Sequence, residues 1–207
     1  MVTEIRIYIE GGGNDNSSKT RIRRGLNSFL SPLLELARNQ GCEWSLILCG
    51  GRNNAFANFL LALRQHPNAF CILLVDSEGK VTLPRWEHLR RQDRWDIPDL
   101  PEDHCHFMVR TIEAWLVADP EALASFYGQG FRRSALPQQE DVEAVEKDDL
   151  MAKLSRAVRD TSKGTYKKID HCAEILKRLD RQKVRSRARH CDLLFTTLEA
   201  RILATAG

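Results

Sequence analysis

The sequence lacks the features that mark several large protein classes. No apolar run reaches the roughly 18 residues that a membrane-spanning helix needs. Residues 1–6 have neither the basic start nor the long apolar middle of a secretory signal peptide. The chain contains no G-x-x-x-x-G-K-[ST], G-x-G-x-x-G or G-x-S-x-G motif. We therefore expect no membrane association, and we set aside P-loop nucleotide hydrolysis and serine-hydrolase chemistry.

Closely spaced cysteine pairs are also missing. None of the 6 cysteines forms a C-x-x-C pair, and several lie within apolar runs. This pattern predicts reduced, mostly buried thiols and a cytoplasmic location. The segment His104–His106 reads His-Cys-His, but no second cluster with ligand spacing accompanies it, so a zinc site is not favoured.

Net charge is small overall but unevenly distributed. The 207 residues carry a formal charge of +3. Residues 1–150 contain 17 Lys and Arg against 22 Asp and Glu, whereas residues 151–207 contain 14 against 6. A basic half can indicate an anionic partner, although solvated helix faces would give the same asymmetry. We expect an α/β core over residues 1–127 and a basic helical extension over 128–207, packed together as one compact unit.

Hydrophobic patterns alternate between strand and helix in the first half of the chain. Strands are expected over residues 4–9, 44–48, 70–75 and 105–109, and helices over residues 17–37 and 53–65. Pro32 predicts a kink or break in the first of these helices. This order predicts an α/β fold with a parallel sheet, and the continuous apolar run 70–75 predicts a strand covered on both faces. After Lys147 the chain is expected to be helical, with breaks near 163–164 and at Asp180.

Carboxylates follow three of the predicted strands. Glu10 ends the first strand, Asp76 and Glu78 follow the third, and Glu113 follows the fourth. Parallel sheets bind ligands at the carboxyl ends of their strands, so these side chains are expected to meet if the first and third strands are neighbours. Asp76 and Glu78 would point the same way in an extended chain. Clustered carboxylates repel one another unless a cation neutralises them, and their oxygens suit Mg²⁺ or Mn²⁺.

Each of these acids also has an ordinary structural explanation. A Glu at a strand end is usually solvated, Asp-Ser-Glu-Gly is a common turn sequence, and Glu113 at a helix start is favoured by the helix dipole. The metal-site interpretation therefore depends on the joint placement of the four residues. Three glycines after Glu10 would let a phosphate or ribose approach the backbone closely.

Several of these segments resemble one bacterial family in the same order along the chain. They are Ile7–Gly11 (IYIEG), Leu73–Glu78 (LLVDSE), Ile112–Trp115 (IEAW) with Ala118-Asp119, Phe126–Phe131 (FYGQGF) and Lys163–Lys167 (KGTYK). They look like the family catalogued as domain of unknown function 4276, over nearly the whole chain. That family resembles the Toprim domains of topoisomerases, primases and overcoming-lysogenization-defect nucleases.

The resemblance implies a Toprim-like fold and a metal-dependent nuclease site. Glu10 matches the Toprim Glu, Asp76 matches the first Asp of the Asp-x-Asp motif, and Glu113 matches a later acid of the nuclease branch. Glu78 stands where a second Asp is usual, which keeps the charge but lengthens the side chain. The resemblance also implies an ATPase partner of the ABC or AAA type and a role as the effector of an anti-phage defence system.

Basic residues of the C-terminal part would hold the phosphates of a nucleic acid beside such a site. We expect Lys163 or Lys167 to assist catalysis by stabilising the leaving group's charge. The residues expected to bind nucleic acid are Arg159, Lys163, Tyr166, Lys167, Lys168 and His171. Surface solubility, or binding of an acidic partner protein, would explain the same basic residues without catalysis.

Two functions therefore remain open at the level of sequence. The first is a Mg²⁺- or Mn²⁺-dependent nuclease whose metal ligands are Glu10, Asp76, Glu78 and Glu113. The second is a non-catalytic or latent module that binds a partner ATPase or a nucleic acid. The sequence does not choose between DNA, RNA and tRNA, between exo- and endonuclease action, or between oligomeric states.

Overall fold

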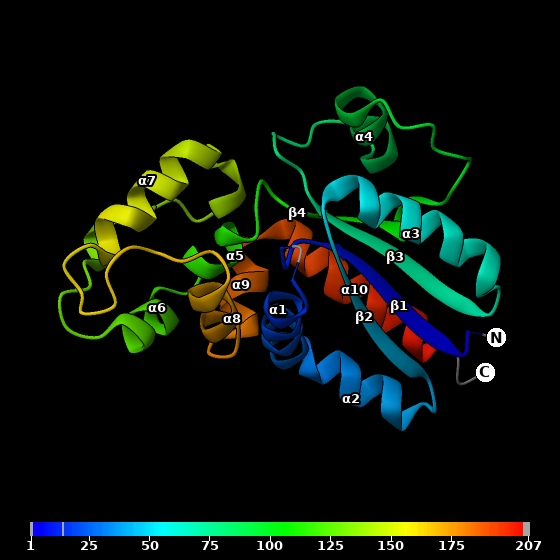
Figure 1. Ribbon diagram of the computed structural model, residues 1–207, viewed down its shortest axis with the longest axis horizontal. Coiled ribbons are helices and arrows are strands. Elements are labelled where there is room, and N and C mark those ends of the chain that lie inside the picture. The colour runs from blue at the N-terminus through cyan, green and yellow to red at the C-terminus, as the bar shows by residue number, and fades with distance from the viewer. Residues whose placement is uncertain (1, 14, 205–207) are drawn as a thin grey trace.

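A four-stranded parallel sheet forms the centre of the molecule (Figure 1). The computed structural model describes residues 2–13 and 15–204. The strand order is β2-β1-β3-β4, and every pair of neighbours is parallel. The strands are β1 (Glu4–Glu10), β2 (Glu43–Gly50), β3 (Ala69–Asp76) and β4 (Cys105–Met108). The predicted parallel α/β fold is thus confirmed, and β1 and β3 are direct neighbours.

Helices cover both faces of this sheet. The α-helices are α1 (Asn16–Phe29), α2 (Ser31–Asn39), α3 (Arg52–Gln65), α4 (Arg85–Asp93), α5 (Glu113–Val117), α6 (Pro120–Tyr127), α7 (Lys147–Val158), α8 (Asp170–Leu176), α9 (Arg181–Arg187) and α10 (Arg189–Leu203). Short 3-10 helices span Glu102–His104, Arg133–Ala135 and Val142–Ala144. None of the helices in the described ranges is both long enough and apolar enough to cross a membrane.

Alternate residues of β1 divide the core into two clusters. Ile5, Ile7 and Ile9 face the larger cluster, which includes residues of α1, α2, α5 to α8 and α10. Tyr8 faces the smaller cluster, which includes residues of α3 and α4. The two-residue side-chain period of a strand produces this division. β3 is buried from Phe70 to Asp76, as its continuous apolar run predicted.

The C-terminal helices pack on the α/β core through the larger cluster, which runs from Ile5 to Ile202. α8 lies directly against α1 (Figure 1). Gly25 of α1 makes this approach possible, since a Cβ atom there would lie 2.7 Å from the carbonyl oxygen of Ala173. α1 and α8 therefore reach the carboxyl edge of the sheet as one wall.

Local breaks fall where the sequence indicated them. α1 ends at Phe29, and α2 begins with Pro32 in its first turn. Residues 159–169 separate α7 from α8, and Asp180 caps α9 by accepting from the backbone N–H groups of Gln182 and Lys183. All six cysteines are buried free thiols, in agreement with the expectation from their spacing.

Candidate functional site

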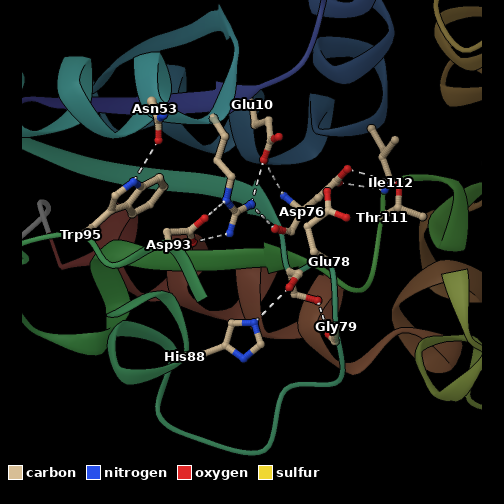
Figure 2. A network of polar contacts seen from close by, with 12 residues as sticks. Glu10, Asn53, Asp76, Glu78, Gly79, His88, Asp93, Trp95, Thr111 and Ile112 are labelled. Carbon is tan, nitrogen blue, oxygen red and sulfur yellow. Dashed lines mark hydrogen bonds and ion pairs between the residues drawn. The ribbon is translucent and has the colours of Figure 1, made fainter. Parts of the chain in front are cut away.

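Three of the four expected carboxylates lie at the carboxyl edge of the sheet, and Figure 2 shows two of them, Glu10 and Asp76. Glu10 ends β1, Asp76 ends β3, and Glu113 opens α5 after β4. The backbone N–H of Asp76 donates to Glu10 Oε2 at 3.3 Å, which joins the first two across neighbouring strands. Glu113 is 1% exposed and Asp76 6% exposed, so both acids are buried.

Thr111 joins Asp76 to Glu113. Its Oγ1 lies 3.2 Å from Asp76 Oδ2 and is also hydrogen-bonded to Glu113 Oε2. The other oxygen of Asp76 accepts from the backbone N–H of Ile112 at 3.1 Å. The other oxygen of Glu113 accepts from the hydroxyl of Tyr166 at 3.0 Å. The two buried acids are therefore held in one network by the segment that connects β4 to α5.

This network has fewer protons than it has acceptors. A threonine hydroxyl carries one hydrogen and can donate to only one of the two carboxylates it contacts. The other carboxylate receives no hydrogen from this hydroxyl, and a proton or a cation beside it would relieve the repulsion between the two acids. Burial and the negative charges of Glu10 and Glu113 together raise the pKa of Asp76 to about 7, against the opposing effect of Lys168 and Lys147. The position of Asp76 thus favours an added positive charge.

Arg52 is a site residue that sequence reasoning missed. Its guanidinium donates to Glu10 Oε2 at 3.0 Å and to the backbone carbonyl of Asp76. A bidentate pair with Asp93, at 2.7 and 2.8 Å, fixes the guanidinium from the other side. Trp95 lies over it, with 5.4 Å from Cζ to the ring centroid. Its position along the chain provided a signal for this role, because Arg52 follows the carboxyl end of β2 in the same way that Glu10 and Asp76 stand at the carboxyl ends of β1 and β3.

Glu78 does not join the other three acids. Its expected direction assumed an extended chain, but Glu78 has a φ of 59°, so the chain leaves the strand conformation after Asp76. Its carboxylate is paired with Lys147 at the start of α7. The expectation that Asp76 and Glu78 point the same way required an extended chain, and the structure does not meet that condition at Glu78.

Two of the expected nucleic-acid-binding residues stand at the carboxylates. Tyr166 donates to Glu113, as described above. Lys168 lines a cavity together with Glu10 and Asp76. Burial disfavours the charge of Lys168, but the carboxylates of Glu113 and Asp76 outweigh that effect and raise its pKa. Among the basic residues expected from the sequence to bind nucleic acid, Lys168 thus lies close to the acids.

The other expected basic residues have different surroundings. The ammonium of Lys163 lies 4.9 Å from the ring centroid of Phe126, and Arg159 pairs with Asp160 at 3.5 Å. His171 is buried, and its Nδ1 lies 3.0 Å from the hydroxyl of Tyr127. The side chain of Lys167 is exposed. The proposed roles of these residues at a phosphate remain predictions.

The donor set suits a hard divalent cation, although the present positions do not form a finished metal site. Within residues 2–13 and 15–204, no group of three or more His, Cys, Asp or Glu side chains is placed to hold a metal ion. The carboxylate of Glu10 uses only Oε2 for its hydrogen bonds to the described residues (Figure 2). Oε1 of Glu10 and the oxygens of Asp76 are the kind of ligands that Mg²⁺ and Mn²⁺ prefer.

Comparison with known proteins places the chain in a family. A family model described as Domain of unknown function (DUF4276) covers residues 9–199. That range includes Glu10, Arg52, Asp76, Glu113 and Lys168, so it spans the whole candidate site. No curated protein and no solved structure matches the chain.

Proposed function

The chain belongs to the family of the domain of unknown function 4276, and from its gathered carboxylates we propose that it is a Mg²⁺- or Mn²⁺-dependent nuclease. The observation that carries this proposal is the group of Glu10, Asp76 and Glu113 at the carboxyl edge of a parallel sheet. This edge is the usual ligand site of such sheets. Two of the three acids are buried and share a single hydroxyl. A cation bound beside them would offset their mutual repulsion.

Glu10 and Asp76 would hold the metal, with Glu113 completing its negative surroundings. A bound divalent cation supplies an activated water and stabilises the negative charge that develops on a phosphodiester during hydrolysis. Lys168 would bind a non-bridging phosphate oxygen at the rim of the same cavity. Arg52 positions Glu10 through its hydrogen bond to Oε2 and keeps a positive charge beside it.

The wider role that we propose depends on the family's resemblance to Toprim nucleases. In that role the protein is a cytoplasmic effector of anti-phage defence that works with an ABC- or AAA-type ATPase. The excess of basic residues over residues 151–207 supports a polyanionic partner, with 14 Lys and Arg against 6 Asp and Glu. The effector role and the ATPase partner are supported by the resemblance alone.

The alternative is a latent or non-catalytic module, and two ion pairs favour it. Arg52 already neutralises Glu10, and Lys147 already neutralises Glu78. A carboxylate with a basic partner has less need of a metal ion. In this alternative the network stabilises the fold, and the protein binds its partner without cleaving phosphodiesters.

Metal titration and cleavage assays separate the two functions. Calorimetry with Mn²⁺ and cleavage of single-stranded and duplex DNA and RNA are compared for wild type, Asp76→Asn and Glu35→Gln. The Asn variant keeps the shape of Asp76, and exposed Glu35 on α2 provides a matched control. We expect Asp76→Asn to lower cleavage by more than the roughly 10–100-fold that loss of an outer-shell partner of a metal ligand costs, and Glu35→Gln to leave cleavage unchanged.

Two outcomes count against the nuclease. Equal cleavage by the wild type and by Asp76→Asn would show that the cleavage comes from a contaminant. Wild type that binds no Mn²⁺, with a thermal unfolding midpoint unchanged by the metal, would favour the non-catalytic module. Metal binding without cleavage would support latency, and cleavage would then be measured again with a partner ATPase present.

A further inference from the structure

A largely apolar cavity adjoins the candidate metal site. It has a volume of about 360 Å³ and is lined by residues at the ends of β1, β3 and β4 and by residues of the wall formed by α1 and α8. Glu10, Asp76 and Lys168 line its polar part. Its volume lies in the range of small-ligand sites, about 300–1,000 Å³.

The lining of this cavity contains more apolar surface than phosphodiester hydrolysis requires. Its apolar part is lined by Ile22 and Leu26 of α1, Ile169 and Cys172 near the start of α8, and Met108 of β4. A metal ion, a water molecule and a phosphate need polar partners, and none of them gains from such a surface. The apolar part therefore fits a portion of the ligand that carries no charge.

The glycine segment 11–13 forms another part of the lining. All three glycines have positive φ values, which L side chains rarely adopt. A Cβ atom on Gly12 would also lie 3.1 Å from the backbone of Lys19 and 3.4 Å from Leu48. The segment thus presents bare backbone at the cavity, and a flat ligand can approach it closely.

We propose that this cavity binds the nucleoside of a single nucleotide, with its base against the apolar wall and its phosphate between the carboxylates and Lys168. The inference rests on the proposed function and extends it by naming the part of the substrate that is recognised. Apolar side chains are a common surface for an extruded base, and charged groups at the rim match the adjoining phosphate.

The proposal has a consequence for the form of the substrate. A base in a duplex is stacked between its neighbours and paired, so it reaches a cavity of this size only after it is unstacked and unpaired. Single-stranded or flexible nucleic acid avoids that cost. We therefore expect single strands and loops to be the substrates, in preference to intact duplex.

The test measures binding of adenosine 5′-monophosphate and ribose 5-phosphate in the presence of Mn²⁺ by calorimetry. The two probes carry the same phosphate and sugar and differ in the base. We expect the nucleotide to bind wild type about tenfold more tightly, which corresponds to about 1.4 kcal/mol. Ile169→Trp, which fills the cavity from a half-buried rim position, should remove that advantage while the affinity for ribose 5-phosphate stays the same.

Leu61→Trp provides the matched control, because Leu61 is 49% exposed on α3 and does not line the cavity. It should bind both probes as wild type does. A second cavity variant, Ile22→Phe, guards against misfolding of Ile169→Trp, and unfolding midpoints check both. Equal affinity of wild type for the two probes, or an unchanged nucleotide preference in both folded cavity variants, would overturn the proposal.

Failure here is distinguishable from failure of the proposed function. If the nucleotide preference is present but no nucleic acid is cleaved, the cavity assignment stands and the nuclease proposal fails. If metal-dependent cleavage is present but neither probe distinguishes the base, the cavity assignment fails alone. Absence of binding by both probes also overturns it.

Discussion

Replacement of Arg52 by methionine tests whether the network around Glu10 stabilises the folded state. The side chains of Arg52, Glu10 and Asp93 are 15%, 19% and 13% exposed, so water screens them only weakly. Arg52→Met removes both bonds to Asp93 and the bond to Glu10, and it leaves two acids without their basic partner. Breaking a buried ion pair costs 3–5 kcal/mol, and at this partial exposure we expect about 3 kcal/mol.

The exposed pair of Arg91 and Glu87 offers a matched comparison. These side chains are 67% and 38% exposed and are four residues apart on α4. Arg91→Met should therefore cost only about 0.3–0.5 kcal/mol. Urea denaturation of the wild type and both variants, followed by circular dichroism, gives the free energies of unfolding.

A double-mutant cycle assigns the cost to the charge network. The double variant Arg52→Met/Asp93→Leu should lose about 2 kcal/mol less free energy of unfolding than the sum of the two single variants, because position 93 then no longer holds an acid without its basic partner. Glu10 stays unpaired in the double variant, so recovery is partial. If Arg52→Met costs no more than Arg91→Met, the network adds no stability and this account of Arg52 is refuted.

Two further substitutions test the packing and the buried titratable groups. Gly25→Ala should destabilise the protein by about 1–2 kcal/mol in urea denaturation, because crowding against Ala173 outweighs the gain of about 1 kcal/mol in helix propensity. The control Gly79→Ala has open space around the new methyl group and should be nearly neutral. Equal costs for the two variants would contradict the close contact of α1 and α8. Burial lowers the pKa of His106 to about 3, so below pH 6.5 the unfolded chain takes up a proton that the folded chain does not. Stability measured from pH 7 to pH 5 should therefore fall about 2 kcal/mol further in wild type than in His106→Gln, and parallel curves would show that His106 is protonated in the folded state.

The fold was predictable because its signals are local and mutually consistent. The apolar run 70–75 is too continuous for a half-exposed strand, and it became β3, which is buried on both faces. Pro32 and Asp180 carry the backbone chemistry of a helix start, and each stands at one. The strand order required one further assumption, that β1 and β3 are neighbours, which the sheet confirms.

The site was predictable only in part, because strand ends reveal where a side chain starts but not what it contacts. Glu10 and Asp76 were identified from their place after a strand. Thr111 and Arg52 were not identified from the sequence, although Thr111 links two carboxylates and Arg52 is hydrogen-bonded to Glu10. Hydroxyl and guanidinium groups occur throughout any sequence. Their roles here depend on contacts between residues far apart in the chain, Thr111 with Asp76 over 35 positions and Arg52 with Glu10 over 42.

Glu78 shows how one backbone angle limits an inference from spacing. The two-residue rule for Asp76 and Glu78 holds only while both residues keep extended φ and ψ angles. β3 ends at Asp76, and the φ of 59° at Glu78 turns the chain before the second acid is reached. The carboxylate then meets Lys147, which is 69 positions away and gives no signal near Glu78 in the sequence. A motif with two acids can thus place one carboxylate at the sheet edge and the other in an ion pair with α7. The first residue that leaves the strand conformation determines which acid goes where.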